Sequence, residues 1–108
     1  MDGDLCFIDD LSGDALTASA YFHDHAIARI AALFERGSDT IAIVVPVATY
    51  DHRDWRLAAT RDLARRYAPR RINMIEGGRG PALEAASAYL RSAPGVTGQY
   101  LPLSQSGD

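Results

Sequence analysis

A glycine-rich segment at 76–80, with the sequence EGGRG, has the residue types that bind anions. It directly follows an apolar segment at 71–75 that has the composition of a buried strand. Backbone N–H groups in such a loop, together with a guanidinium, can hold a carboxylate or a phosphate at the carboxyl end of a strand. The candidate anion-binding residues are Gly77, Gly78, Arg79 and Gly80. The simpler interpretation, a loop that needs glycine only for a tight turn, stays open.

A second group of polar side chains, Tyr50, Asp51 and His52, follows the apolar run that ends at Ala48. A tyrosine becomes a useful base when a nearby positive charge lowers its pKa. Here the nearby charged residues Asp51 and Asp54 are acids, and a neighbouring carboxylate raises the pKa of a tyrosine. We therefore expect Tyr50 to stay protonated, and we regard the three residues as weak catalytic candidates.

Two histidines in the segment HDH, His23 and His25, together with His52, have the residue type of a metal site. Residues at positions i and i+2 of a helix point to nearly opposite sides, so His23 and His25 cannot easily share one ion. His23 lies on the same predicted helix face as Ile27, which favours a packed or interface histidine. We expect no metal site.

The chain contains no lysine, because all 11 basic residues are arginines. Schiff-base chemistry, a lysine general base and a Walker-type phosphate lysine are therefore excluded. The paired acids Asp9 and Asp10 resemble those of response-regulator receiver domains, but that family also needs a lysine after its last strand. Two exposed acids that enter a loop explain the pair.

Seven of the arginines lie between residues 53 and 71, whereas the whole chain has a net charge of −3. A net negative charge argues against general nucleic-acid binding, and no aromatic-interleaved or nucleic-acid motif accompanies the arginines. We interpret most of them as the solvated face of one helix, and we expect no nucleic-acid partner.

The composition is that of a single globular domain, with 47% hydrophobic and 23% charged residues among 108. We expect the domain to cover 1–103 and a flexible polar tail to follow at 104–108. The longest apolar run, at 41–48, is far too short to span a bilayer, and the acidic N-terminus is unlike a signal peptide. A lone cysteine, Cys6, allows no internal disulfide and indicates a buried thiol in a cytoplasmic protein.

Strand-like and helix-like segments alternate along the chain without a repeat or a linker. Short β-branched runs predict buried strands, and segments with apolar residues at i, i+3, i+4 and i+7 predict helices. Glycine and proline mark the ends of these elements. The alternation predicts a parallel sheet with right-handed crossovers and helices layered on it. The expected strands are 5–8, 40–48, 71–75 and 98–103, and the expected helices are 15–36, 52–68 and 81–92.

Three longer stretches are LFERGSDTIAIVV at 33–45, RDLARRYAPRRINMIEGG at 61–78 and AASAYLRSAPGVTGQYLPL at 85–103. In this order they resemble the C-terminal half of the short-chain dehydrogenase/reductase family. The first is similar to a helix end and the central strand before the catalytic serine. The second resembles the helix that carries the active-site tyrosine and the strand after it, and Asn73 falls where that strand usually has an Asn. The third resembles the last helix and the last strand, where a T-G-Q pattern is common. The resemblance implies a truncated Rossmann-like three-layer α/β fold, with about four parallel strands and three helices.

At the positions that the resemblance aligns, the chain lacks the residues that the family uses for cofactor binding and catalysis. The family's dinucleotide site needs a glycine-rich turn after its first strand, and the half of the fold that would carry this turn is missing from the match. The position of the catalytic serine falls near Val45 and Pro46, and the lysine expected four residues after the tyrosine is Asp54, if Tyr50 is that tyrosine. The resemblance therefore implies a degenerate, non-catalytic protein that acts as an oligomeric assembly or interaction module. No cofactor is expected, and NAD(P) would bind only if a second chain completed the site.

Two alternatives stay open: a small-ligand-binding protein, and an NAD(P)-linked oxidoreductase-type enzyme that uses a cleft at the strand ends. In each case the strand at 5–8 would form an open edge with unpaired backbone groups. We expect a homodimer through the helices at 15–36 and 52–68, where members of the resembled family commonly pair. A full-length homologous partner is the other candidate, and no membrane partner is expected.

Overall fold

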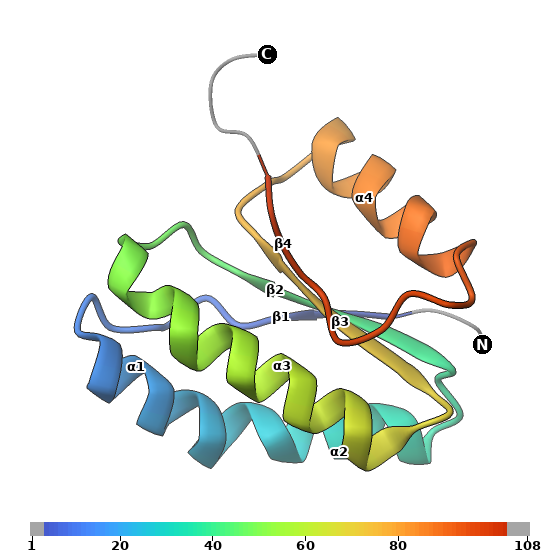
Figure 1. The fold of residues 1–108 in the computed structure, drawn as a ribbon, viewed down its shortest axis with the longest axis horizontal. Helices are drawn as coiled ribbons and strands as arrows, with labels where there is room; N and C mark the ends of the chain where they lie inside the picture. Colours follow the sequence, from blue (N-terminus) through green and yellow to red (C-terminus); the bar gives the residue numbers. More distant parts are fainter. Residues whose placement is uncertain (1–3, 104–108) are drawn as a thin grey trace.

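Four parallel strands form one sheet in the computed structural model, which describes residues 4–103 (Figure 1). Neighbouring strands are hydrogen-bonded in the order β1-β2-β3-β4. Their bounds are Asp4–Phe7 for β1, Thr40–Val45 for β2, Arg71–Glu76 for β3 and Tyr100–Pro102 for β4. The four predicted strands are confirmed, and the second ends before 48 because Pro46 has no N–H for a ladder. The predicted tail at 104–108 lies outside the described residues.

One long helical segment connects β1 to β2. Its parts are α1 (Ala15–Tyr21), a π-helical turn η1 (Phe22–Ala26) and α2 (Ile27–Glu35). The Asp14 carboxylate caps its start by accepting a hydrogen bond from the backbone nitrogen of Thr17 at 2.9 Å. Gly37, with a φ of 108°, ends it. The predicted helix at 15–36 is thus confirmed, with a wider turn in its middle that apolar periodicity did not indicate.

Two further helices complete the chain, and they confirm the helices predicted at 52–68 and 81–92. The 3-10 turn η2 (Tyr50–His52) leads into α3 (Arg53–Tyr67), and α4 spans Pro81–Arg91. None of the helices within residues 4–103 combines the length and the apolar character that crossing a bilayer requires.

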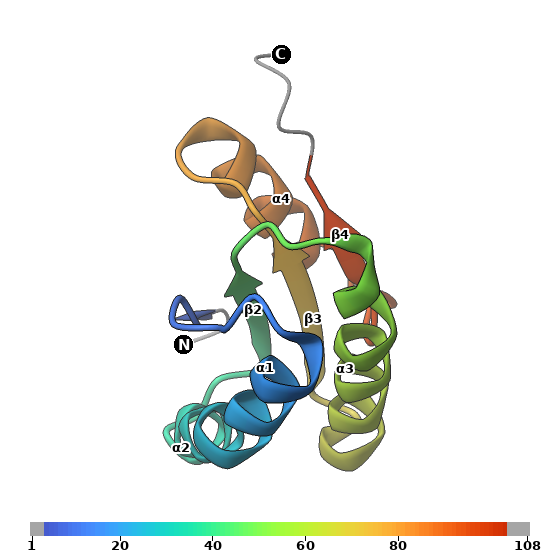
Figure 2. The ribbon, with the colours of Figure 1, turned by 90° about the vertical axis from the view of Figure 1, so that its left-hand side faces the viewer.

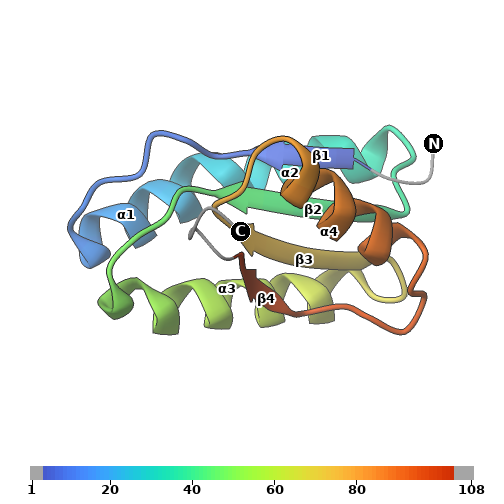
Figure 3. The ribbon, with the colours of Figure 1, turned by 90° about the horizontal axis from the view of Figure 1, so that it is seen from above.

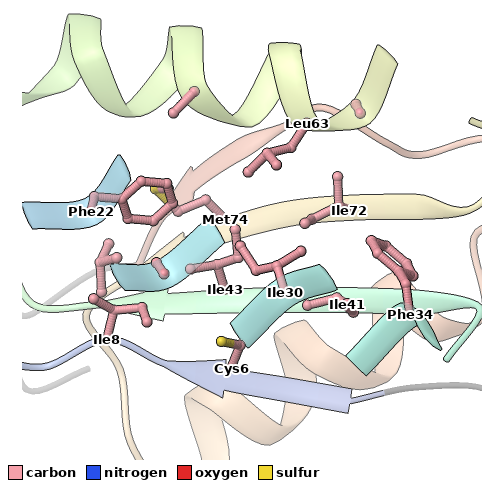
Figure 4. Close-up of a cluster of buried hydrophobic side chains, with 14 residues drawn as sticks. Cys6, Ile8, Phe22, Ile30, Phe34, Ile41, Ile43, Leu63, Ile72 and Met74 are labelled. Carbon is pink, nitrogen blue, oxygen red and sulfur yellow. The ribbon is translucent and has the colours of Figure 1, made fainter. Parts of the chain in front are cut away.

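Helices cover both faces of the sheet, so the fold has three layers. The α1–α2 segment and α3 lie on one face and α4 lies on the other, as Figure 2 and Figure 3 show from two sides. The larger apolar cluster lies under the first face and includes Phe22, Ile30 and Met74 (Figure 4). The smaller cluster, under α4, includes Ile75 and Leu83. This is a compact Rossmann-like α/β arrangement, as the sequence predicted.

The last crossover has the opposite hand to the first two. The strands follow one another in sheet order, but α4 connects β3 to β4 across the face that the other helices leave open (Figure 2). The prediction of right-handed crossovers is therefore wrong for this connection. Right-handedness is a strong preference that follows from strand twist, and here it yields to burial of the apolar side of α4 against the bare face.

A buried polar network joins β3 to the segment that leads into β4. Asn73 is 0% exposed; its Nδ2 donates to the carbonyl oxygen of Val96 at 3.1 Å, and its Oδ1 accepts from the backbone nitrogen of Gln99 at 2.9 Å. One residue earlier on β3, the backbone nitrogen of Ile72 donates to Oγ1 of Thr97 at 3.0 Å. These bonds hold the T-G-Q residues against β3, so this motif has a structural role.

Two arginines of the cluster at 53–71, Arg70 and Arg71, bind backbone carbonyls at helix ends. Nη1 of Arg70 donates to the carbonyl oxygen of Phe34 at 2.9 Å. Nη1 of Arg71 donates to the carbonyl oxygens of Leu90 and Ala93, both at 2.7 Å. A cation is favourable at a helix C-terminus, so these side chains stabilise the ends of α2 and α4. Their role is to cap helices and not only to carry surface charge.

Strand β1 lies at one edge of the sheet, with β2 as its only neighbouring strand among residues 4–103. The backbone nitrogen of Ile8 donates to the carbonyl oxygen of Val44 at 2.9 Å, so the alternate residues Leu5 and Phe7 direct their backbone groups away from β2. Nη1 of Arg29 donates to the carbonyl oxygen of Phe7 at 2.9 Å. A side chain thus covers part of the edge.

Candidate functional site

The glycine-rich loop lies at the carboxyl end of β3, where the sequence placed it. Gly77, Gly78 and Gly80 have φ angles of 75°, 85° and 64°, a backbone region that favours glycine. An added Cβ at Gly78 would also lie 2.5 Å from Cδ1 of Leu103, so the Leu103 side chain would have to shift to accept it. The tight-turn interpretation therefore accounts for all three glycines without a ligand.

Arg79 is paired with a carboxylate instead of facing an empty anion site. Its Nη2 lies 3.0 Å from Oδ1 of Asp9, and its guanidinium lies 4.6 Å from the ring centroid of Phe7. Both charged side chains are more than half exposed, so the pair contributes little to stability. The cavity beside it, of about 150 Å³, is lined by Asp9, Val45, Pro46, Gly77, Gly78 and Arg79. An anion that entered this cavity would have to compete with Asp9 for the guanidinium.

The predicted candidates Tyr50 and Asp51 lie on the surface of η2. Tyr50 is 85% exposed. Asp51 accepts a hydrogen bond from the hydroxyl of Thr49, and this bond lowers the pKa of the Asp51 carboxyl. A carboxylate with a lowered pKa is a weak base. Within residues 4–103, Asp51 makes no hydrogen bond to the phenol of Tyr50.

His52, the third candidate, is a buried structural residue, 1% exposed. Its Nε2 lies 2.9 Å from the carbonyl oxygen of Gly13, to which it donates, and its Nδ1 accepts from Nε1 of Trp55 at 3.2 Å. Both ring nitrogens are therefore occupied, and the ring ties the start of α3 to the loop before α1. The structure does not bring His52 together with Tyr50 and Asp51 as a reactive group.

The other two histidines lie in η1 and bind their own helix. Nδ1 of His23 lies 2.8 Å from the carbonyl oxygen of Ser19, and Nδ1 of His25 lies 3.2 Å from that of Tyr21. Within residues 4–103, no group of three or more histidine, cysteine, aspartate or glutamate side chains could hold a metal ion.

A buried arginine that the sequence interpretation missed lies on the inner side of α3. Arg56 is 0% exposed, and its Nη1 donates to the carbonyl oxygen of Pro46 at 2.9 Å and to Oε1 of Glu76 at 3.0 Å. The same carboxylate oxygen accepts from the hydroxyl of Tyr100. Burial lowers the pKa of Arg56, and the Glu76 carboxylate opposes this shift. Arg56 is therefore an exception to the solvated face that the sequence predicted for most of these arginines.

Helical spacing contained a signal for this arginine. Arg56 lies three and seven residues before Ala59 and Leu63, which are both buried on the inner face of α3. A charged residue at such spacing predicts a buried ion pair, because an isolated buried charge is very costly. Its partner could not be read from α3 itself, since Glu76 lies 20 residues further along the chain.

A cleft of about 230 Å³ lies beside this cluster, at the carboxyl ends of β2, β3 and β4. It is lined by Ala48, Thr49, Tyr50, Arg53, Glu76, Tyr100 and Pro102. The guanidinium of Arg53 lies 5.8 Å from the ring centroid of Tyr100. The cleft thus presents a carboxylate, two phenols and a guanidinium, and Tyr50 is the one predicted site residue in its lining.

A parallel sheet with helices on both faces defines the class of this protein as Rossmann-like α/β. The chain belongs to the short chain dehydrogenase-like family, because the model described as short chain dehydrogenase-like protein matches residues 6–103. This match confirms the resemblance drawn from the sequence. No curated protein and no solved structure matches the chain significantly.

Proposed function

We propose that this short chain dehydrogenase-like protein is non-catalytic and acts as an assembly module through a homodimer. The observation that carries this proposal is a groove of about 600 Å³ between the α1–α2 segment and α3. Its lining residues are His23, Ile27, Ala59, Asp62, Leu63, Arg65 and Arg66. The helices on either side are those through which we expected a homodimer, because members of the family commonly pair there.

The groove has a chemistry that suits a second copy of the same chain. Ile27, Ala59 and Leu63 give it an apolar floor, and the small side chain at Ala59 allows a helix to approach closely. Its rim carries charges of both signs, with Asp62 beside Arg65 and Arg66. In a two-fold symmetric contact the acid of one copy can face the arginines of the other.

The residues at the strand ends support the non-catalytic part of the proposal. Tyr50 has Asp54 where the family's tyrosine has a lysine, and the chain has no lysine to supply. Both nitrogens of His52 are occupied, and Arg79 is paired with Asp9. We therefore propose that the isolated chain binds no NAD(P), and that a full-length homologous partner would be needed to complete such a site. The single thiol, buried at Cys6, supports a cytoplasmic location.

The dimer is tested by light scattering and native mass spectrometry at micromolar concentration. We expect a dimer for the unaltered chain and a monomer for Asp62→Arg, because the new arginine would face the arginines of the second copy. Glu84→Arg is the matched control, since Glu84 is an exposed acid on α4, on the opposite face. A monomeric unaltered chain, or an Asp62→Arg variant that dimerises normally, would contradict the proposal.

Cofactor binding is tested with the fluorescence of Trp55, the single tryptophan of the chain. Titration with NADPH and with NAD⁺ up to millimolar concentration is expected to leave the emission unchanged after correction for absorbance. A saturable change would favour the oxidoreductase-type alternative for the isolated chain.

A further inference from the structure

The buried side chain of Arg56 has hydrogen-bond donors that lack acceptors among residues 4–103. Its side chain is 0% exposed, and its Nε and Nη2 atoms have no hydrogen-bond partner among residues 4–103. Unpaired donors on a buried guanidinium cost free energy, because burial removes the water that would otherwise bind them. Unsatisfied buried groups of this kind are rare, and a functional site is one of the settings in which they persist.

Glu76 connects this buried charge to the surface. Its Oε1 already accepts hydrogen bonds from Arg56 and from the Tyr100 hydroxyl, while no hydrogen bond within residues 4–103 uses its Oε2. The Glu76 side chain is 16% exposed and lines the cleft at the strand ends. Arg56 therefore fixes the carboxylate from behind, and one of its oxygens stays available as an acceptor.

Arg53 places a second guanidinium at the mouth of the same cleft. It lies almost one helical turn before Arg56 on α3, it is exposed, and it stacks over the ring of Tyr100 at 5.8 Å. Among the residues that line the cleft, Arg53 is the one cation and Glu76 is the one carboxylate, and the Glu76 carboxylate is already paired with the buried Arg56. The exposed guanidinium of Arg53 is therefore the group in the lining that can pair with an anion.

We propose that this cleft binds a small hydroxycarboxylate. The carboxylate of the ligand pairs with the guanidinium of Arg53, and its hydroxyl group donates to Glu76, whose position Arg56 fixes. A guanidinium matches the planar geometry of a carboxylate, whereas the acceptor oxygen of Glu76 requires a donor and repels a second anionic group. This inference goes beyond the assembly role proposed above and does not depend on it.

The size of the cleft limits the ligand. At about 30 Å³ for each water molecule, 230 Å³ corresponds to roughly eight waters. This volume is below the 300–1,000 Å³ of sites for drug-sized ligands, so the ligand is a molecule of a few carbon atoms. A dinucleotide does not fit in this cleft.

The binding test uses the unaltered full chain labelled with ¹⁵N. The Nε–Hε signal of Arg56 and the indole signal of Trp55, whose ring lies 5.6 Å from the Arg56 guanidinium, report on the site. The probes are lactate, propionate, which lacks the hydroxyl, lactamide, which lacks the charge, and inorganic phosphate, all at constant ionic strength. Lactate is expected to give saturable shifts, propionate to bind about fivefold more weakly, and lactamide and phosphate to bind at least tenfold more weakly.

Substitution of an exposed arginine separates the site from general anion binding. Arg53→Ala is expected to weaken lactate binding at least tenfold, because it removes a charged hydrogen bond. Arg36→Ala, which removes an exposed arginine at the far end of α2, is the matched control and is expected to bind lactate normally. The absence of saturable shifts by about 100 mM lactate would overturn the proposal. Equal binding by Arg53→Ala, or phosphate or lactamide binding as tightly as lactate, would overturn it as well.

Discussion

The side-chain oxygen Oδ1 of Asn73 accepts a hydrogen bond from the backbone nitrogen of Gln99 at 2.9 Å, across the connection between β3 and β4. The opposite end of the same amide donates to the carbonyl oxygen of Val96 at 3.1 Å. One buried side chain thereby satisfies two backbone groups of a segment that has no helix or strand of its own. This pairing fixes where β4 begins.

Asn73→Ala is expected to destabilise the fold by about 2–3 kcal/mol, because the buried Asn73 amide and its two hydrogen bonds to partly buried backbone groups are lost. Urea denaturation followed by circular dichroism measures this change. Gln99→Ala is the matched control, since the backbone nitrogen of Gln99 makes the bond and the substitution retains it; we expect a change within about 0.5 kcal/mol. Equal losses in the two variants would contradict the assignment of the network to Asn73.

The pair of Arg56 and Glu76 is expected to show strong coupling. Glu76→Gln leaves a buried guanidinium without its counter-charge, and the expected loss of stability is about 3 kcal/mol. The double variant Arg56→Met with Glu76→Gln removes both charges and is expected to recover at least half of this loss. A double-mutant cycle in urea measures the coupling, and additive losses would show that the pair makes no specific contribution.

Gly78→Ala is expected to destabilise the protein by about 1–2 kcal/mol, since alanine resists a φ of 85°. The new Cβ would also contact Leu103, so Leu103→Ala is expected to relieve part of the cost. Gly13→Ala is the control because nothing lies within 4 Å of an added Cβ there. Thermal melts of the three variants compare these effects, and a neutral Gly78→Ala would refute the packing argument.

The Asp14 cap is expected to make stability depend on pH. Hydrogen bonds from Thr17, first its hydroxyl and then its backbone nitrogen, lower the pKa of the Asp14 carboxyl in the folded chain. The stabilisation is therefore fully present above the unfolded pKa of about 3.9 and is lost as pH falls through the lower folded value. The difference in melting temperature between the unaltered chain and Asp14→Ala is expected to shrink over that range.

Asp14→Asn provides the comparison for this pH effect. Asparagine is a good N-cap and does not titrate, so the variant should keep its melting temperature better than the unaltered chain on acidification. A difference between the unaltered chain and Asp14→Ala that stays constant down to about pH 2 would contradict the role of the Asp14 charge.

The elements of the fold could be predicted because each has a local cause. The β-branched run at 40–45 forms a strand that is buried along its whole length, and Gly37 ends the helix before it. In contrast, no local feature of the sequence determines the face of the sheet on which α4 packs. Leu83 and Leu90 show that one side of α4 is buried, but either face of the sheet could bury it. The preference for right-handed crossovers then gave the wrong hand.

The candidate site was harder to predict because its residues meet through the sheet and not through local spacing. Arg56 lies among arginines that are mostly exposed, and its partner Glu76 comes from the end of a different strand. Tyr50 reaches the same cleft from η2, whereas His52, two residues later, turns into the core. Sequence proximity grouped Tyr50 with His52, but the backbone turn between them sends the two side chains in different directions.

The buried position of Cys6 makes its alkylation a measure of how often the edge strand β1 opens. It is the one thiol of the chain, it is 2% exposed, and burial raises its pKa, so a thiol reagent can modify it only after β1 separates from its surroundings. The rate of alkylation therefore reports how frequently this strand opens under native conditions. A molecule that covered the edge would slow that rate without any change in the thiol itself.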